Sequence, residues 1–299
     1  MHGAPILVEE VEVNYAAEAG STRTVLRRIN LEIPGGEFVS IVGETGCGKS
    51  TLLRLILGEE RPSRGRVLVD GVARMRPDRK CGYVPQKYSL FPDKTVLHNV
   101  TFGPMVTEFG ALPLPFRRYR RRRKEVRDEA LRYLRHTGLR DSDAGKYPHQ
   151  LSGGMQQRVA IAQALIMKPR VLLMDEPFSA LDPGTRAAMQ QLIWELWRES
   201  GTTIVFVTHD TREAICLGSR IVALAKAPSA NGEDGASVAL DLRIPRLGFG
   251  SPEEEIKTLV RQVETSAAPH LFQKRPAEPL ALNYQAPPLG VVEVSKMKA

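Results

Sequence analysis

The segment that decides the fold is GETGCGKS, residues 43–50. Its spacing fits G-x-x-x-x-G-K-[ST], the loop that binds the phosphates of a nucleoside triphosphate. An apolar, β-branched run at 37–42 precedes it, and residues 49–57 predict a helix that ends at Gly58. Glycines between a strand and a helix let backbone N–H groups point at phosphate oxygens. The alternative, a glycine-rich turn before an ordinary helix, is disfavoured because both flanking elements are present.

A second and rarer string, LSGGMQQ at residues 151–157, lies downstream of this loop. It precedes a predicted helix whose apolar stripe includes Met155, Val159, Ala162 and Ile166. Small residues at a helix N-terminus form an anion site of similar chemistry to the first. One chain therefore carries two predicted phosphate-binding loops.

The bulk composition limits the class of protein. With 299 residues the chain can bury a substantial core in one or two domains. It contains no apolar run of about 18 residues, which predicts no membrane span, and residues 1–5 lack the basic and apolar regions of a secretory signal. The three cysteines are scattered, which predicts reduced thiols in a cytosolic protein and disfavours a disulfide framework or a zinc site.

The positive charge of the chain is local. The net charge is +8, and the stretch RRYRRRRK at 117–124 carries seven positive charges, which leaves +1 for the rest. A nucleic-acid-binding protein is expected to spread its basic residues over a face, so no nucleic-acid partner is expected. Two interpretations of the stretch stay open: a solvated helix face, or contact with anionic lipid headgroups near a membrane partner.

The hydrophobic pattern divides the chain into three regions. Residues 6–34 alternate as antiparallel β structure, with further strands at 65–71 and 81–84, and the pattern is helical from 86 to about 167. Within that helical region Val126, Ala130, Leu131 and Leu134 form one apolar stripe, and Gly138 just past it predicts a helix end. Strands then alternate with helices, which predicts a parallel sheet. These predicted elements are strands 171–174, 203–208 and 220–225 and helices 184–200 and 211–218.

The last part of the chain differs in composition. Residues 227–235 predict a linker or long turn, and SPEE at 251–254 predicts the start of a helix, with a cap, a proline and early acidic residues. From about residue 268 the sequence is proline-rich and has no period, which predicts an extended or disordered tail.

The two strings, in this order, resemble the phosphate loop and the signature of ABC-type ATPases, and the resemblance covers roughly residues 6–226. It implies an α/β fold: a P-loop NTPase core with an antiparallel β subdomain and an inserted α-helical subdomain. The implied domains are an ATPase domain at 1–226, with the helical insert at about 87–167, and a C-terminal extension at 227–299 with one short helix.

The resemblance also implies catalytic and metal-binding residues. VLLMDE at 171–176 resembles the Walker B strand, so Asp175 would hold Mg²⁺ and Glu176 would polarise the attacking water. A strand end with solvated acids is the less favoured alternative. His209 resembles the switch histidine, and Gln86 resembles the Q-loop glutamine, which can touch both Mg²⁺ and the water. SALD at 179–182 resembles the D-loop, which in the family runs along a partner subunit.

Nucleotide contacts follow from the same resemblance. Lys49 would reach the β- and γ-phosphates of ATP, and the Ser50 hydroxyl would ligate Mg²⁺. Tyr15 resembles the aromatic residue that stacks on adenine, although a tyrosine in a short strand also serves packing alone. The residues expected to bind the nucleotide are Tyr15, Gly43, Glu44, Thr45, Gly46, Cys47, Gly48, Lys49, Ser50, Thr51, Ser152, Gly153 and Gly154.

The resemblance implies a head-to-tail dimer, with ATP between one subunit's phosphate loop and the signature of a second copy or a paralogous subunit. Transmembrane permease subunits would dock near residues 88–92 and the helix 95–106, and would place the chain at the cytoplasmic face of the cell membrane as a peripheral subunit. An extracytoplasmic solute-binding protein would take part indirectly.

YSLFP at 88–92 and DLRIPR at 241–246 resemble the importers of nitrate, sulfonates and taurine, whereas Gln163 stands where many relatives have arginine. Two alternatives stay open. One is a soluble ABC ATPase that acts on nucleic acid or ribosomes, for which a coiled-coil insertion or a second fused ATPase unit is expected. The other is a nucleotide-gated regulator without hydrolysis, against which Glu176, His209 and Gln86 argue.

Overall fold

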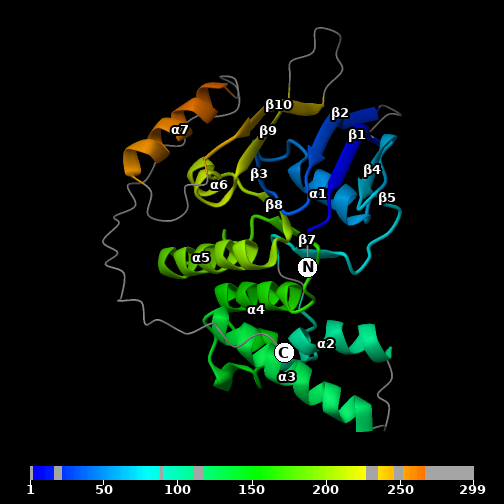
Figure 1. Cartoon of the computed structure of the whole chain (residues 1–299), viewed down its shortest axis with the longest axis vertical. Coiled ribbons are helices and arrows are strands. Elements are labelled where there is room, and N and C mark those ends of the chain that lie inside the picture. The colour runs from blue at the N-terminus through cyan, green and yellow to red at the C-terminus, as the bar shows by residue number, and fades with distance from the viewer. Residues whose placement is uncertain are drawn as a thin grey trace.

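The computed structural model describes residues 3–16, 22–87, 90–110, 117–226, 235–245 and 252–266. Within these ranges the strands form one ten-stranded sheet in the order β5-β4-β1-β2-β10-β9-β3-β8-β7-β6, with a separate helical layer beside it (Figure 1). The strands are β1 (Ile6–Ala16), β2 (Thr22–Ile33), β3 (Phe38–Gly43), β4 (Arg64–Val69), β5 (Val72–Ala73), β6 (Cys81–Val84), β7 (Val171–Asp175), β8 (Thr203–Val207), β9 (Arg220–Lys226) and β10 (Ala236–Arg243). The helices are α1 (Lys49–Leu57), α2 (Val96–Phe109), α3 (Arg117–His136), α4 (Gly153–Leu165), α5 (Pro183–Ser200), α6 (Thr211–Leu217) and α7 (Glu253–Ser266).

The sheet has an antiparallel and a parallel half. β1 pairs antiparallel with both β2 and β4, whereas β3, β8, β7 and β6 pair in parallel, and β9 lies parallel to β3. Parallel strands need crossover connections, which α5 and α6 provide between β7, β8 and β9. The predicted combination of an antiparallel β subdomain with a parallel core is confirmed.

Two strands of the sheet, the short β5 and the longer β10, were not predicted. β10 pairs antiparallel with β9 and in parallel with β2, so it joins the two halves. The Arg220 guanidinium fixes it by two hydrogen bonds of 2.6 Å to the Asp241 carboxylate. The boundary proposed at residue 226 stays a prediction, but the segment beyond it contributes a strand to the main sheet as well as the expected helix.

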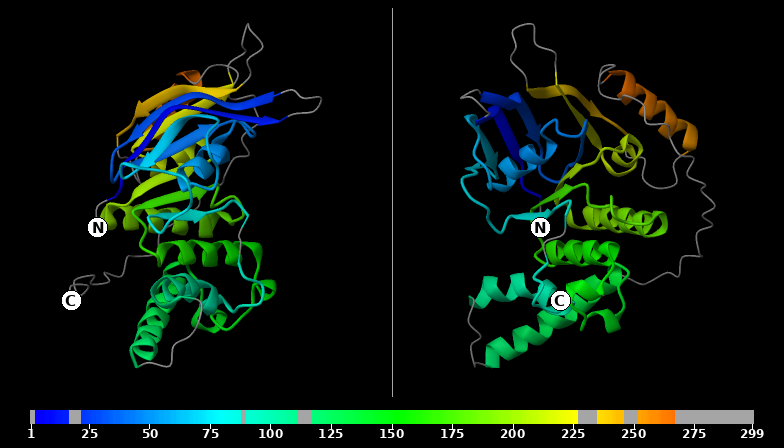
Figure 2. Two further views of the ribbon diagram at one scale, coloured as in Figure 1. Left: turned by 90° about the vertical axis from the view of Figure 1, so that its right-hand side faces the viewer. Right: turned by 180° about the vertical axis from the view of Figure 1, so that it is seen from behind.

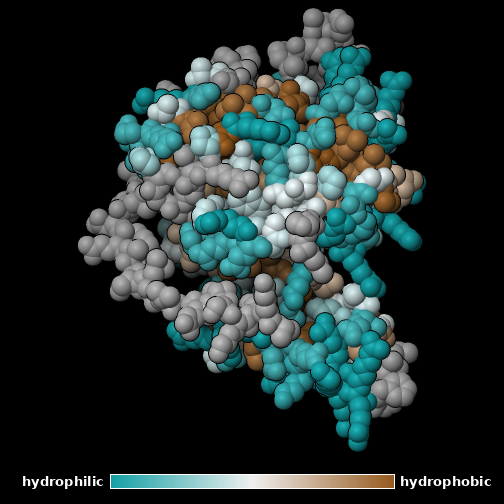
Figure 3. All heavy atoms as spheres, in the orientation of Figure 1, coloured by the Kyte–Doolittle hydropathy of each residue, from teal (hydrophilic) through white to brown (hydrophobic). Residues whose placement is uncertain are grey.

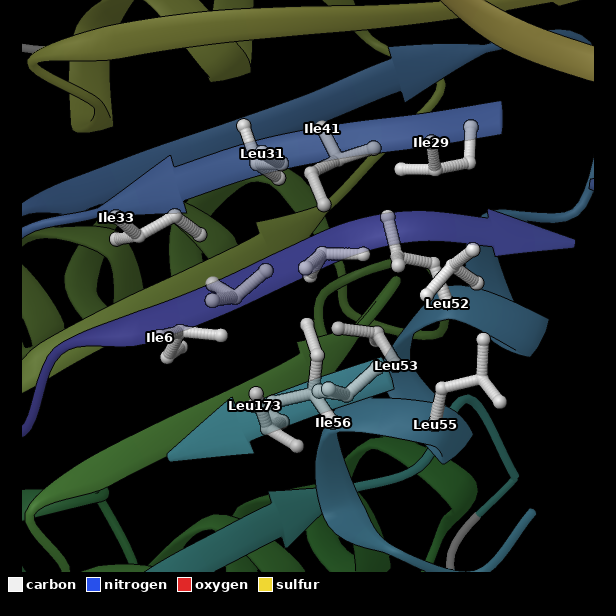
Figure 4. Close-up of a cluster of buried hydrophobic side chains, with 14 of the residues drawn as sticks. Ile6, Ile29, Leu31, Ile33, Ile41, Leu52, Leu53, Leu55, Ile56 and Leu173 are labelled. Atoms are coloured by element: carbon white, nitrogen blue, oxygen red, sulfur yellow. The ribbon is translucent and has the colours of Figure 1, made fainter. Parts of the chain in front are cut away.

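The main core lies where the sheet curls around α1. Leu52, Leu53, Leu55 and Ile56 of this helix are buried against β1, β2, β3 and β7 (Figure 4). Burying each such side chain stabilises the fold by about 1.5–3 kcal/mol. Gly58 ends the helix as predicted, with a φ of 85° and its N–H bonded to the carbonyls of the last turn. This packing fixes the helix whose first residues form the phosphate loop.

The helical layer is formed by α2, α3 and α4, and it lies below the sheet in Figure 1. α3 contributes the predicted stripe to its core, with Val126, Ala130 and Leu134 buried and Leu131 partly buried. Gly138 follows that helix with a φ of 74°, and its N–H donates to the Arg135 carbonyl at 2.9 Å. The expected helical insert is therefore present, with its predicted glycine cap.

The C-terminal helix α7 packs on α6. Ile256 and Val263 are buried in the interface, and the Arg212 guanidinium pairs with the Glu253 carboxylate. Residues 227–234 of the predicted linker at 227–235 lie outside the described residues, as does the predicted tail from about residue 268. Among the helices that the structure describes, none combines the length and apolar character needed to cross a bilayer.

Candidate functional site

The phosphate loop joins β3 to α1 and closes around a lysine. Lys49 lies in the first turn of α1 and is 5% exposed. Its Nζ atom donates hydrogen bonds to the carbonyl oxygens of Gly43 at 2.7 Å and Glu44 at 2.8 Å. These bonds hold the ammonium group inside the loop, where a nucleotide's phosphates are expected.

Two glycines let the loop pass close to the sheet. Gly43 has a φ of 153°, and a Cβ atom there would lie 2.4 Å from the Leu224 carbonyl oxygen and 2.9 Å from the Cys47 Sγ atom. Gly48 has a φ of 102°, and a Cβ atom there would lie 2.6 Å from the Leu26 Cδ2 atom. The glycines are thus required by packing against β9 and β2 as well as by the turn.

Gly43→Ala is expected to lower the free energy of unfolding by about 1–3 kcal/mol, because the added methyl group overlaps the backbone of β9. Urea unfolding of the full chain measures the change. Gly145→Ala is the matched control, since a Cβ atom at Gly145 has open space around it. Equal unfolding midpoints for the Gly43 and Gly145 variants would contradict this account of the loop.

Asp175 and Ser50 form an oxygen-rich pair at the end of β7. Asp175 is 5% exposed, and the Ser50 side chain interacts with its carboxylate. Burial raises the pKa of Asp175, and the Ser50 interaction and the charge of Lys49 act in the opposite direction. A hydroxyl and a carboxylate suit Mg²⁺, which takes few protein ligands and shares phosphate oxygens. Among the residues that the structure describes, no group of three or more His, Cys, Asp or Glu side chains is placed to hold a metal ion.

Glu176 is held at the centre of the site by its backbone. It adopts a φ of 43°, a left-handed conformation that costs a non-glycine residue on the order of 1–3 kcal/mol. Its N–H donates to the Val207 carbonyl at 2.9 Å, and its own carbonyl accepts from the Ser179 hydroxyl at 2.9 Å. Neighbouring segments thus compensate the strain, which is the arrangement expected where a side chain must be aimed.

Three predicted catalytic residues meet at one oxygen atom. The Oε2 atom of Glu176 lies 3.3 Å from the Gln86 Nε2 atom and 3.1 Å from the His209 Nδ1 atom. Gln86 follows β6, Glu176 follows β7 and His209 follows β8, so each side chain comes from the carboxyl end of a parallel strand. The sheet therefore brings together residues that lie far apart in the sequence.

The electrostatics of this pair favour charge on both partners. The hydrogen bond from His209 is the main cause that lowers the pKa of Glu176. The same bond raises the pKa of His209 above its usual value of 6.5. Near neutral pH the carboxylate is ionised, as a proton acceptor must be, and the imidazole holds more positive charge than a free one.

The pKa of His209, followed by NMR titration of the ring protons, is expected to lie above 6.5 and to fall towards 6.5 in Glu176→Gln. The contribution of His209 to stability is complete below pH 6.5, its usual pKa. This contribution is lost as the pH rises through the raised pKa of His209. The contribution of Glu176 to stability is lost as the pH falls through the lowered pKa of its carboxylate. An unchanged histidine pKa in the variant would show that the contact does not persist in solution.

Glu213 supports the segment before His209 and was not singled out from the sequence. Its carboxylate accepts hydrogen bonds from the Thr208 hydroxyl and from the Gln190 Nε2 atom of α5, the latter at 2.7 Å. Thr208 is buried, and its N–H donates to the Ile41 carbonyl of β3 at 3.2 Å. Burial raises the pKa of Glu213. The available signal was its spacing of three residues from Asp210, the N-cap of α6, because residues at that spacing are neighbours on a helix.

Tyr15 lies at the end of β1, where it is 38% exposed. Its hydroxyl is hydrogen-bonded to the Glu60 carboxylate. The ring therefore has a fixed hydroxyl and an accessible face. This geometry is compatible with stacking on a base, which stays a prediction.

The signature residues are not brought to the phosphate loop of their own chain. Ser152 caps α4, which packs on α2, α3 and β6, whereas α1 packs on β3, β4, β7 and β8. A Cβ atom at Gly154 would lie 3.5 Å from the carbonyl oxygen of Ala180, in the predicted D-loop. The Gln157 Nε2 atom donates to the Pro85 carbonyl at 3.3 Å, next to Gln86. The signature helix is thus linked to two segments of the site while its amino end remains separate from the loop.

Comparison with known proteins agrees with this geometry. The profile of the family described as ABC transporter matches residues 26–179. An aliphatic sulfonates import ATP-binding protein of Bacillus thuringiensis is 35% identical over 257 residues, which cover 86% of this chain and 94% of that protein. A taurine import ATP-binding protein of Rhizobium johnstonii is 42% identical over 221 residues, which cover 74% of this chain and 79% of that protein.

Among solved structures, the dimeric post-hydrolysis state of the ATP-binding cassette MJ0796, bound to ADP and Pi, superimposes with a TM-score of 0.68 and 34% sequence identity. The match covers 80% of this chain and 99% of that one. The profile, the two relatives and the fold agree with the order of the two phosphate-binding strings. The chain belongs to the ABC transporter family.

Proposed function

We propose that this chain is the ATP-hydrolysing subunit of a membrane importer for a small anion such as a sulfonate, taurine or nitrate. The observation that carries the proposal is the convergence of Gln86 and His209 on the Glu176 carboxylate, beside the buried Lys49 and Asp175. Phosphoryl transfer depends mainly on positioning and charge, which these groups supply. The import functions named for the sulfonate and taurine relatives support the importer assignment.

The residues have separate tasks in the proposed reaction. Lys49 and the loop N–H groups bind the phosphates of ATP, and Tyr15 supports the adenine. Ser50, Asp175 and Gln86 would hold Mg²⁺, which when bound neutralises charge on the phosphate oxygens. Glu176 orients the attacking water and accepts its proton. His209 and Gln86 keep the Glu176 carboxylate in position and link it to β8 and to the helical layer.

The site is completed by another chain in this proposal. Ser152, Gly153 and Gly154 of a second copy, or of a paralogous subunit, would contact the phosphates across a head-to-tail interface. Their separation from the phosphate loop of the same chain supports this arrangement. The dimeric state named for MJ0796 supports it as well. A site divided between chains makes hydrolysis depend on closure, and closure is the useful motion.

Permease subunits are proposed to dock at the start of α2 and at the turn that precedes it in the sequence. The buried Asn99 side chain bonds to the backbone at Phe91 and Lys94, which fixes this turn. The Phe91 ring is exposed and packs on Phe102 at 4.9 Å between ring centroids. A rigid turn with an exposed aromatic ring suits a docking contact. Tyr88 and Ser89, part of the predicted surface, lie outside the described residues.

Uptake measurements test the importer assignment. A strain of the source organism that lacks this chain is expected to lose uptake of labelled taurine, an alkanesulfonate or nitrate. The wild-type sequence supplied in trans should restore the uptake, and Glu176→Gln should not. Unchanged uptake of all three anions would overturn the proposed substrate class, while ATP hydrolysis by the purified chain would still be tested separately. A location at the cytoplasmic face, with an external solute-binding protein as indirect partner, belongs to the same proposal.

A further inference from the structure

We propose that the amino-terminal half of α3, residues 117–124, binds the anionic lipid surface of the membrane that surrounds the transporter. We call these residues the basic end of α3. The inference rests on the proposed function for one point alone, that the chain works next to a bilayer. The binding itself is argued from exposure, charge and helix geometry.

The basic end of α3 projects from the protein. The first buried residue of the helix is Val126, and the helix packs through Val126, Ala130 and Leu134. Arg118 and Arg121 have 82% and 84% of their side chains exposed. Figure 2 shows this end of the helix extending beyond α2 and α4, and Figure 3 shows a hydrophilic surface over it. Its cations are therefore accessible to a partner.

Most of the charge at this end is uncompensated. Glu108 pairs with Arg118 and Arg122, and Glu125 pairs with Arg121 and Arg122. Four further cations make neither an ion pair nor a side-chain hydrogen bond with any residue that the structure describes; they are Arg117, Arg120, Arg123 and Lys124.

The end of the helix makes these unpaired cations still less favourable. The amino end of a helix carries a partial positive charge, and the first turn of α3 contains no acidic residue. Cations at that end are therefore unfavourable in water, where exposed Glu108 and Glu125 offset only part of the charge. An external anionic surface relieves both the mutual repulsion and the unfavourable helix end.

The geometry of the basic end favours a bilayer over a nucleic acid. Successive residues of a helix turn by about 100°, so a nearly continuous run of cations points in every direction around the axis. The cations therefore surround the projecting end of α3 on all sides and do not line a groove. The rest of the chain has a net charge of only +1, so a second basic surface for a polyanion is not expected. A layer of mobile anionic headgroups can surround a projecting end from all sides.

Long side chains also suit this partner. Arginine and lysine stems extend and place their charges at the headgroup level, while Tyr119 anchors the helix by packing its ring on Phe109, 5.2 Å between centroids. Each cation near an anionic membrane surface strengthens binding by about fivefold. The four unpaired cations together are therefore expected to strengthen it by on the order of 10²- to 10³-fold.

Cosedimentation of the purified full chain with vesicles tests the proposal. Binding is expected to vesicles with about one third phosphatidylglycerol and not to phosphatidylcholine alone, and it should weaken as NaCl rises from about 0.05 M to about 0.5 M. The neutralised variant is expected to lose on the order of 10²-fold or more in partition coefficient. Its substitutions are Arg117→Gln, Arg120→Gln, Arg123→Gln and Lys124→Gln.

Two control variants separate the basic end from charge in general. One keeps the charge with Arg117→Lys, Arg120→Lys and Arg123→Lys, and should bind within a few-fold of wild type because the attraction is electrostatic. The other removes four exposed cations elsewhere and should also bind nearly as wild type. Its substitutions are Arg61→Gln, Arg76→Gln, Arg79→Gln and Arg261→Gln.

The outcomes decide between the partners. Equal vesicle binding by the neutralised variant and wild type, or no wild-type binding, would overturn the proposal. Binding to a DNA or RNA duplex that is tighter than binding to vesicles, and lost in the neutralised variant, would assign the basic end to nucleic acid instead. ATP hydrolysis in solution should be the same for wild type and the neutralised variant. Inactive protein that still binds vesicles would count against the proposed function and not against this inference.

Discussion

Glu176→Gln is expected to reduce the turnover number for ATP hydrolysis by about 10²-fold or more while ATP binding remains. Glutamine keeps the size of the side chain but cannot accept the proton of the attacking water. The carboxylate is already positioned by the bonds from Gln86 and His209, so the loss falls on the chemical step. Phosphate release at saturating ATP measures the turnover number, and titration with a fluorescent ATP analogue measures binding.

Glu199→Gln is the matched control for this substitution, because Glu199 is exposed near the end of α5. It should hydrolyse ATP at the wild-type rate. Full turnover by Glu176→Gln would remove Glu176 from the role of proton acceptor. A loss of ATP binding in the same variant would instead assign Glu176 to nucleotide affinity.

Lys49→Ala is expected to weaken ATP binding by on the order of 10²-fold or more, with hydrolysis lost in consequence. The substitution removes the cation that we propose faces the phosphates. It also leaves the carbonyls of Gly43 and Glu44 without their donor. Calorimetric titration with ATP measures the affinity, and the urea midpoint reports how far the loop is destabilised.

Lys257→Ala, in the exposed face of α7, is the control for the loss of a lysine and should bind ATP as wild type does. A folded Lys49→Ala chain with unchanged ATP affinity would refute the phosphate-loop assignment. If the variant is destabilised, Lys49→Arg provides the second measurement. It retains the charge, so weaker binding in that variant reports on the fit of the ammonium group inside the loop.

Local features of this fold were predictable because they depend on neighbours in the sequence. The strand, loop and helix at 37–57 were readable from apolar periodicity and from the glycines, and Gly58 and Gly138 marked helix ends that the structure contains. The Asp182 cap and Gly201 at the two ends of α5 have the same local character.

Features that depend on distant pairing were harder to predict. The segment ASVALDLR at 236–243 has polar and apolar residues in an incomplete alternation, so it gave no clear strand signal. What fixes β10 is the bond between Arg220 and Asp241, which belong to neighbouring strands. A chain's pattern of hydrophobic residues does not encode such a polar contact.

In the functional site, too, single residues were predictable from the sequence and their arrangement was not. The resemblance to ABC ATPases supplied Gln86, Glu176 and His209 as separate residues with expected roles. Their meeting at one carboxylate oxygen follows from the order of β6, β7 and β8 in the sheet, which no single motif contains. The support from Glu213 depends on the packing of α6 against α5 and β3, so only the structure identified it.

In the proposed function a second chain's signature completes the ATP site, and sedimentation of the Glu176→Gln chain shows whether it does. Without turnover, ATP should convert the monomer to a dimer. Adding Gly153→Asp should keep the chain monomeric, because the new carboxylate repels the phosphates while being favourable at the helix N-terminus, so folding is preserved. Dimers that form with ATP and disappear with Gly153→Asp are the predicted result. A chain that binds ATP as a monomer, or dimerises regardless of Gly153→Asp, would show that the signature of a second chain does not complete the site.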